Sequence, residues 1–245
     1  YGRHFDDSVP PRAVGEKLLK RNLSDIAAMG GRPVAAVLSV TLDARVSCRW
    51  IEHFYRGLAA AARRYRVQMV GGDVAEADGI VAASLTLLGE ATASRVLTRT
   101  GAHLGDALYV TGLLGRSRAT GHHYRFSPRL AEGRWLARQP QVRAMMDVSD
   151  GLAKDIHALT PRQAAPAIWA ELLPSRTGAD VRATLTDGED YELLFALAAN
   201  ADAPKFTAAW RRKFPRTPLT RIGCFAAKRG LPAGAIDLRS YHGYE

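Results

Sequence analysis

The chain has 245 residues, of which 47% are hydrophobic, enough for one large domain or two modest ones. No apolar run reaches the roughly 18 residues that cross a bilayer, and the first residues lack the apolar core of a signal peptide. The two cysteines have neither metal nor redox spacing. We therefore expect a cytoplasmic protein without a membrane partner. The net charge is +10, but the basic residues are scattered and not interleaved with aromatic residues, which disfavours nucleic acid and suits a protein that handles phosphates.

Helical and strand patterns alternate along the first part of the chain. Apolar residues at near-helical spacing predict a helix from about Arg12 to Met29, which Gly30-Gly31 end. Ser47 is a suitable N-cap for a second helix, whose apolar face includes Phe54 and Leu58. Short apolar stretches predict strands over residues 34–42, 67–70 and 80–89.

A polar, glycine-containing stretch over residues 91–106 follows, and we place a domain boundary within it, giving domains 1–92 and 93–245. After a strand over 107–111, two helices are expected, the second of them over 128–138. A further helix is expected over 151–159, and strands over 142–148, 167–172, 191–198 and 219–225. Both halves therefore mix helices and strands, which predicts an α/β fold.

Acidic residues recur where predicted elements meet glycines. They are Asp25, Asp73 after Gly71-Gly72, the pair Asp147 and Asp150, and Glu189. Carboxylates gathered in one cleft repel each other unless cations lie between them, and Mg²⁺ prefers such oxygen ligands. This pattern makes the chain a candidate metal-dependent enzyme.

Each of these features also has a plainer interpretation. Ser149 or Asp150 would serve as the N-cap of the next helix, Asp25 would lie on a solvated helix face, and the glycines before Asp73 would form a turn. The adjacent pair His122-His123 is expected on the surface. No Walker motif, protein-kinase signature or nucleophile elbow is present.

Five motifs occur together in one order. They are Ser24-Asp25-Ile26-Ala27-Ala28-Met29-Gly30, Val70-Gly71-Gly72-Asp73, Arg99-Thr100-Gly101-Ala102 with Gly105-Asp106, Asp147-Val148-Ser149-Asp150-Gly151-Leu152, and Gly188-Glu189-Asp190-Tyr191-Glu192-Leu193. In this set and order the chain, from about His4 to Tyr244, resembles the thiamine-monophosphate kinase family of the aminoimidazole-ribonucleotide synthetase superfamily. The family's Gly-Asp-Asp strand and Thr-Asp pair do not precede His4, so we expect the chain to lack the family's first several dozen residues.

The resemblance implies a role for particular residues. Mg²⁺ would be bound by Asp25, Asp73, Asp147 and Asp150. ATP would lie against Tyr55, Gly72, Asp73, Arg99 and Ser149. Thiamine monophosphate would contact His4, Glu189 and Tyr244.

The resemblance further implies two α/β domains of the aminoimidazole-ribonucleotide synthetase type. The sheets of two N-terminal domains would pair into a barrel in a homodimer, with ATP between the first and second domains. The γ-phosphoryl group of ATP would pass directly to thiamine monophosphate, with Mg²⁺ and with no residue acting as nucleophile or general base. Two alternatives stay open: a sister enzyme with another acceptor, and a non-catalytic ATP-binding homologue.

Overall fold

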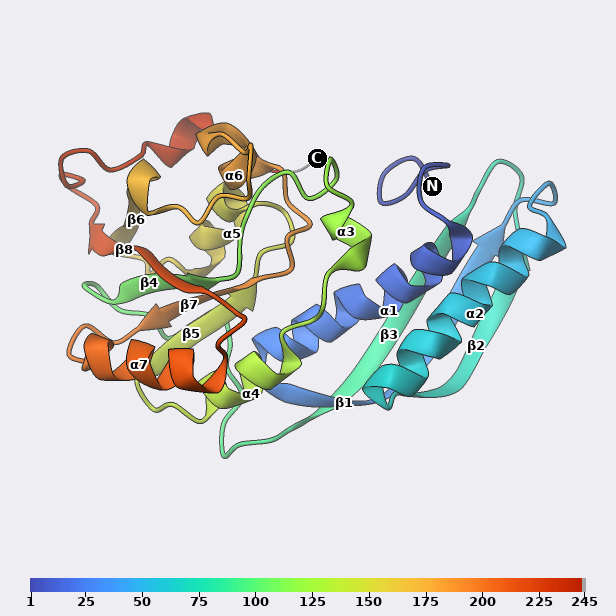
Figure 1. The fold of residues 1–245 in the computed structure, drawn as a ribbon, viewed down its shortest axis with the longest axis horizontal. Coiled ribbons are helices and arrows are strands. Elements are labelled where there is room, and N and C mark those ends of the chain that lie inside the picture. The colour runs from blue at the N-terminus through green and yellow to red at the C-terminus, as the bar shows by residue number, and fades with distance from the viewer. Residues whose placement is uncertain (244–245) are drawn as a thin grey trace.

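The computed structural model describes residues 1–243 and contains two β-sheets, one in each half of the chain (Figure 1). The first sheet has the strand order β2-β1-β3, in which β1 is parallel to β2 and antiparallel to β3. Its half of the chain consists of α1 (Pro11–Ala28), β1 (Gly31–Leu42), α2 (Cys48–Tyr65), β2 (Gln68–Glu76) and β3 (Ala82–Ala91).

Helices α1 and α2 cover one face of this sheet (Figure 1). Leu38 and Val40 of β1 are buried beneath them, while Val37 and Ser39, which alternate with them, are exposed on the other face. Ser47 caps α2 as predicted, because its side chain accepts a hydrogen bond from the backbone of Trp50.

Glycines allow α1 and α2 to pack with their backbones in contact. A Cβ atom on Gly15 would lie 2.0 Å from the carbonyl oxygen of Phe54, and one on Gly57 would lie 1.9 Å from that of Arg12. Real Cβ atoms do not approach a carbonyl oxygen so closely, so any side chain at either position forces the two helices apart.

We therefore expect Gly57→Ala to lower the free energy of unfolding by about 1–3 kcal/mol, the usual cost of overpacking. The matched control is Gly71→Ala on β2, where an added Cβ meets no atom within 4 Å. Urea unfolding of both variants measures the difference. Equal midpoints for the two would show that the helix contact tolerates a methyl group.

The second half of the chain forms a five-stranded antiparallel sheet with the order β5-β7-β4-β8-β6. Its strands are β4 (Ala107–Thr111), β5 (Val142–Asp147), β6 (Ala164–Ile168), β7 (Leu193–Leu197) and β8 (Leu219–Ala227). Its helices are α3 (His122–Arg125), α4 (Leu130–Ala137), α5 (Leu152–Leu159), α6 (Val181–Thr186) and α7 (Ala203–Lys213). Short 3-10 turns lie at Ala170–Leu172 and Leu238–Ser240.

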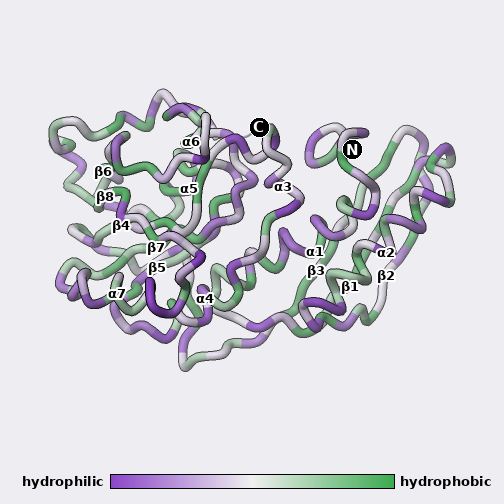
Figure 2. Tube along the Cα trace, viewed as in Figure 1, coloured by the Kyte–Doolittle hydropathy of each residue, from purple (hydrophilic) through white to green (hydrophobic). Residues whose placement is uncertain are grey.

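Both faces of this sheet are buried, and all residues of β4 and β7 except Thr111 are hydrophobic (Figure 2). Leu108 and Val110 pack with α5 and α6, whereas Tyr109 packs on the opposite face with α4 and α7. The C-terminal part of α1 joins this second core through Ala27, against which Gly133 of α4 packs closely.

The structure corrects several predicted boundaries. The strand predicted to end at Val70 continues through Gly71-Gly72-Asp73 to Glu76, because parallel pairing with β1 satisfies its backbone, and the turn interpretation of these glycines is wrong. The strand predicted from residue 191 begins at Leu193, since Tyr191 has a φ of 53°, which a strand does not allow. The strand predicted over 167–172 ends at Ile168, and residues 170–172 form a 3-10 turn.

Two helices, α6 and α7, were not predicted. The start of α7 could have been predicted from the sequence, because Asp202 is a suitable N-cap, which its side chain forms here, and a proline occupies the first turn. Within residues 1–243, every helix is too short or too polar to cross a bilayer.

Candidate active site

A polar hollow lies where α1, β3 and the loop after β5 meet. Asp25 of α1 and Asp147 at the end of β5, far apart in sequence, both line it, together with Ser149. Asp147 is buried and its Oδ2 atom accepts a hydrogen bond of 2.6 Å from the Ser24 hydroxyl, which fixes the end of β5 against α1. The structure thus brings together three of the predicted site residues from both halves of the chain.

The pKa values of both carboxylates in this hollow are raised. Burial and, secondarily, the charge of Asp25 raise the pKa of Asp147 to about 7. Partial burial likewise raises the pKa of Asp25, and the charges of Arg99 and Arg21 oppose this rise. Such a pair favours a bound cation, because a cation between two carboxylates relieves both burial and repulsion.

The four predicted metal ligands do not all converge. Across residues 1–243 the structure shows no group of three carboxylate, imidazole or thiol side chains placed to hold a metal ion. The carboxylate oxygens of Asp25 and Asp147 suit Mg²⁺ chemically. Asp73 lines a different hollow, and Asp150 forms an ion pair of 2.9 Å with Lys154 at the surface.

The loop that carries Ser149 and Asp150 is held by Asp155, a residue that the sequence did not single out. Its carboxylate accepts hydrogen bonds from the backbone N–H groups of Ser149 and Asp150 at 2.8 and 3.0 Å. Burial raises the pKa of Asp155 to about 6. The N-cap of α5 is Gly151, without a side-chain cap, so the capping interpretation of Ser149 and Asp150 is wrong.

Residues predicted to contact ATP are divided between two hollows. Tyr55, Gly72 and Asp73 line one between α2 and β2, whereas Ser149 lies in the hollow that contains Asp25 and Asp147. Packing alone also explains a glycine at position 72, because a Cβ atom there would lie 2.2 Å from the Leu38 carbonyl oxygen.

The sheet register connects these two hollows. Asp73 lies opposite Ser39 of β1, which lies opposite Ser84 of β3, and Ser84 lines the hollow with Asp25. Two strand spacings separate Asp73 from Ser84, about 10 Å. The charge of Arg99 opposes the rise in the pKa of Asp25, so Arg99 lies in the neighbourhood of this carboxylate, although it does not line either hollow.

Glu189 is a buried carboxylate that faces two cationic side chains and a histidine. Its Oε1 atom lies 2.7 Å from Lys17 Nζ and 3.6 Å from His4 Nδ1, and its Oε2 atom lies 3.6 Å from Arg118 Nε. Burial favours the protonated acid, but His4 and Lys17 outweigh it and lower the pKa of Glu189 to about 2. Two of the predicted substrate contacts, His4 and Glu189, therefore lie together, and the third, Tyr244, lies outside the described residues.

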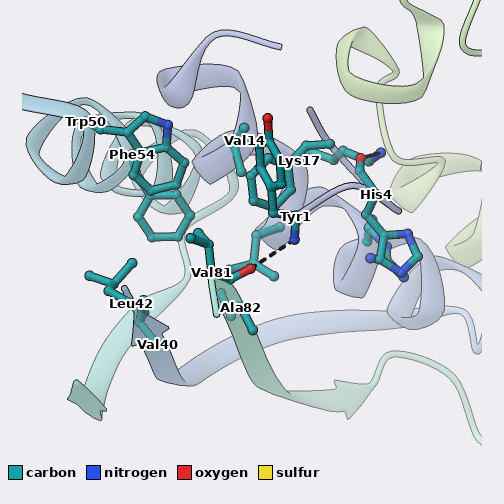
Figure 3. A pocket seen from close by; sticks show the side chains of 14 residues that line it. Tyr1, His4, Val14, Lys17, Val40, Leu42, Trp50, Phe54, Val81 and Ala82 are labelled. Carbon is teal, nitrogen blue, oxygen red and sulfur yellow. Dashed lines mark hydrogen bonds between the residues drawn. The ribbon is translucent and has the colours of Figure 1, made fainter. Parts of the chain in front are cut away.

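An apolar pocket adjoins this ion pair (Figure 3). Lys17 and His4 line it, and Trp50 and Phe54 of α2, whose rings stack at 5.6 Å, form another part of its wall. A ligand that occupied this pocket would have apolar and aromatic contacts beside a charged edge.

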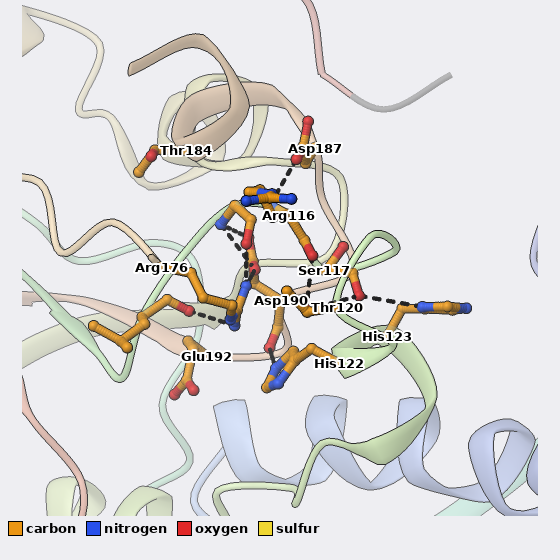
Figure 4. A network of polar contacts seen from close by, with 12 residues as sticks. Arg116, Ser117, Thr120, His122, His123, Arg176, Thr184, Asp187, Asp190 and Glu192 are labelled. Atoms are coloured by element: carbon orange, nitrogen blue, oxygen red, sulfur yellow. Dashed lines mark hydrogen bonds and ion pairs between the residues drawn. The ribbon is translucent and has the colours of Figure 1, made fainter. Parts of the chain in front are cut away.

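A network of buried polar groups supports the Glu189 loop (Figure 4). Asp190 is buried beside Arg176 at 2.9 Å and accepts hydrogen bonds from the backbone N–H of Gly115, while the Ser117 hydroxyl donates to the Gly188 carbonyl oxygen at 2.6 Å. Glu189 itself has a φ of 53°, so this loop is held in a conformation that side chains rarely adopt.

The same network corrects the expectation for two histidines. His123 is buried, and the His122 ring lies 3.0 Å from the Asp190 carbonyl oxygen (Figure 4). Burial, with Arg176 next, lowers the pKa of His122 to about 4. The prediction that His122-His123 lies on the surface is wrong, because α3 packs the His122 ring against the 187–192 loop and buries His123, whose Nδ1 atom lies 3.2 Å from the Ser117 carbonyl oxygen.

The low pKa of Glu189 predicts a pH dependence of stability. Its ordinary value is 4.5, so the stability that its ionised form contributes is complete above this pH and falls as the pH drops toward 2. Between pH 5 and pH 3, wild type should lose about 2 kcal/mol of unfolding free energy more than Glu189→Gln does. Urea unfolding at each pH measures this, and a pH-independent difference between the two proteins would contradict the ion-pair explanation.

Known proteins match this chain in sequence and in fold. Residues 1–91 match the family model described as AIR synthase related protein, N-terminal domain. A structure of the hydrogenase maturation protein HypE in complex with ATP, 19% identical, has a TM-score of 0.71 over 87% of this chain and 71% of its own, which shows the shared fold alone. Residues 1–91 thus match the AIR synthase-related class, and most of the chain shares the fold of HypE.

Relatives with a higher sequence identity to this chain belong to one family within this class. Thiamine-monophosphate kinase of Rhodopirellula baltica is 35% identical in an alignment that covers 89% of this chain and 70% of the relative. The structure of thiamine-monophosphate kinase from Stenotrophomonas maltophilia K279a is 32% identical with a TM-score of 0.80, covering 94% of this chain and 81% of its own. The structure described as AaThiL complexed with AMPPCP and TMP is 30% identical with a TM-score of 0.79, covering 94% of this chain and 79% of its own. The chain belongs to the thiamine-monophosphate kinase family.

Proposed function

We propose that this protein transfers the γ-phosphoryl group of ATP to thiamine monophosphate, which yields thiamine diphosphate and ADP. The observation that carries the proposal is the joint placement of Asp25, Asp147 and Ser149 in one hollow, in a chain whose structural relative is complexed with AMPPCP and TMP. Family membership supports the choice of acceptor.

The chemistry suits a site without an activated nucleophile. The accepting atom is a phosphate oxygen that is already anionic at neutral pH, so no strong general base is needed. The γ-phosphorus–oxygen bond of ATP breaks as the bond to this oxygen forms, and ADP leaves with the electron pair. The main barrier is the approach of two polyanions, which cationic groups and alignment lower. We infer a single direct step, which chiral γ-phosphate would report as inversion.

The residues take the following proposed roles. Mg²⁺ would be held by Asp25, Asp73, Asp147 and Asp150, and would neutralise phosphate charge when bound. ATP would lie along Tyr55, Gly72, Asp73, Arg99 and Ser149, spanning the two hollows. Thiamine monophosphate would contact His4, Glu189 and Tyr244. Arg99 offers a planar guanidinium to phosphate oxygens, and Glu189 offers a negative charge to the cationic thiazolium.

We further propose that residues 1–92 form the ATP-binding and dimerisation domain and residues 93–245 the second domain. The face of the first sheet opposite α1 and α2 exposes apolar side chains, with Val37 at 43% and Leu88 at 57%. Such a face is a candidate for pairing with the same face of a second copy. We place the protein in the cytoplasm, which suits its two free cysteines.

Light scattering at micromolar concentration tests the dimer. The expected mass is that of two chains, and Val37→Asp with Leu88→Asp should shift it toward one, because two pairs of like charges would face each other across the interface. A wild-type monomer that is fully active would refute the pairing.

The reaction is tested by offering ATP with a set of acceptors. We expect thiamine diphosphate from thiamine monophosphate, little product from other phosphate monoesters, and loss of turnover when divalent cations are chelated. Better turnover of another acceptor would instead assign the protein to a sister activity, and equal turnover without divalent cations would remove the role of the carboxylates.

A further inference from the structure

A cationic hollow lies along another face of α1, where this helix meets α2 and residues 124–127. None of the residues that line it lines the hollows or the apolar pocket of the proposed active site. Its charged lining residues are Arg12, Lys20, Arg64 and Arg125 with Glu16, and its aromatic lining residues are Tyr65, Tyr124 and Phe126.

The charge of this hollow is unbalanced. Four cationic side chains line it against one carboxylate, so its net charge is 4 − 1 = +3. The carboxylate, Glu16, is already shared, since it accepts from Arg12 Nε at 3.4 Å. Like charges gathered in a hollow repel one another, and an anion bound among them removes that repulsion.

Lys20 gives the hollow a buried cationic wall. Its side chain is only 6% exposed, its Nζ atom donates to the Tyr124 carbonyl oxygen at 2.5 Å, and it lies 4.9 Å from the centre of the Phe126 ring. An ammonium group has three donors, and within residues 1–243 Tyr124 supplies its one hydrogen-bond acceptor. Burial, with the charges of Arg64 and Lys17 opposing that of Glu16, lowers the pKa of Lys20 to about 8.

The arginines at the rim have aromatic and backbone support. Arg64 lies over the Tyr65 ring at 5.5 Å, and Arg125 lies over the Tyr124 ring at 5.6 Å while its Nε donates to the Gly121 carbonyl oxygen. Such support reduces the freedom that an arginine loses on binding, and a guanidinium matches two phosphate oxygens at once.

We propose that this hollow binds a small anion with two linked phosphate groups. A single phosphate monoester carries up to about two negative charges at neutral pH, which leaves the hollow cationic, whereas a second phosphate brings the charge near balance. The volume of about 400 Å³ accommodates a small ligand. The inference does not depend on the proposed reaction, because it uses none of that site's residues.

Calorimetric titration with inorganic pyrophosphate tests the site, in the presence of a chelator and at constant ionic strength. The test variant is Arg12→Gln with Arg64→Gln, and both arginines are exposed, so folding should be retained. The matched control is Arg211→Gln with Arg212→Gln, an equal charge change on exposed residues of α7. We expect wild type and control to bind equally, and the test variant to bind at least about tenfold more weakly.

Three outcomes would overturn the proposal: no binding to wild type, equal binding by the test variant, or an equal loss in the control, which would indicate diffuse charge attraction only. The source of the diphosphate is resolved by repeating the titration with a nucleoside diphosphate. If the nucleoside diphosphate binds more tightly than pyrophosphate, the ligand is organic; if it binds more weakly, the ligand is the inorganic anion. Both results support the site, provided that Arg12→Gln with Arg64→Gln weakens the binding.

Discussion

Replacing Lys17 by methionine should produce the largest loss of stability of any substitution at the site. Lys17 Nζ and Glu189 Oε1 lie 2.7 Å apart, both side chains are nearly inaccessible to water, and the same ammonium donates to the His4 carbonyl oxygen at 2.6 Å. Methionine fills a similar volume but leaves the carboxylate buried without its closest partner, which typically costs about 3–5 kcal/mol. Urea unfolding gives this difference directly.

The same substitution should also weaken the binding of thiamine monophosphate. Lys17 lies on α1 of the first half and Glu189 on a loop of the second, so their ion pair fixes the loop that we propose contacts the substrate. KM should rise with a smaller change in kcat, since the loss concerns binding rather than the transferring group.

A double variant separates these two effects. Lys17→Met with Glu189→Gln removes the unpaired charge and should recover much of the stability but none of the substrate affinity. Wild-type stability in Lys17→Met alone, or recovery of KM in the double variant, would contradict a positioning role for this pair.

Asp150→Asn should produce the largest loss of turnover relative to its effect on stability. The Asp150 side chain is 46% exposed and pairs with Lys154, which is also largely exposed, so losing this pair should cost less than about 1 kcal/mol. If Asp150 binds Mg²⁺, losing one ligand to a cation that stabilises the transition state should lower turnover at least about 100-fold, since each 1.4 kcal/mol is a factor of ten.

The control for this experiment is Lys154→Met. It removes the same ion pair and keeps the carboxylate, so it should keep near wild-type turnover. Turnover is measured against Mg²⁺ concentration for all three proteins, and added Mg²⁺ should recover part of the loss in Asp150→Asn. Equal turnover of the two variants would remove Asp150 from the metal site.

Local patterns in the sequence were enough to predict most elements of the fold. The spacing of apolar residues places the first helix within a residue of its observed bounds, Pro11–Ala28, and the strand Ala107–Thr111 was predicted without error. The strand through Gly71-Gly72-Asp73 was cut short because glycines weaken a strand signal, whereas the observed strand depends on its parallel partner β1.

The parts of the site that the sequence did not reveal depend on contacts between the two halves. Nothing local to Lys17 indicates that it meets Glu189, and nothing near Asp155 indicates that it holds the backbone of the preceding loop. The burial of His123 likewise follows from the packing of α3. The acidic motifs could be located from the sequence pattern. The cationic side chains around them, and the hydrogen bonds that hold their backbone, could be identified only from the folded structure.

The most direct test of the central claim follows the fate of the γ-phosphoryl group. Purified protein is incubated with ATP labelled at this group, thiamine monophosphate and Mg²⁺, and the products are resolved by ³¹P NMR. We predict that the label appears in the terminal phosphate of thiamine diphosphate in step with the formation of ADP. Release of the label as inorganic phosphate, with thiamine monophosphate left unchanged, would contradict the proposed kinase activity.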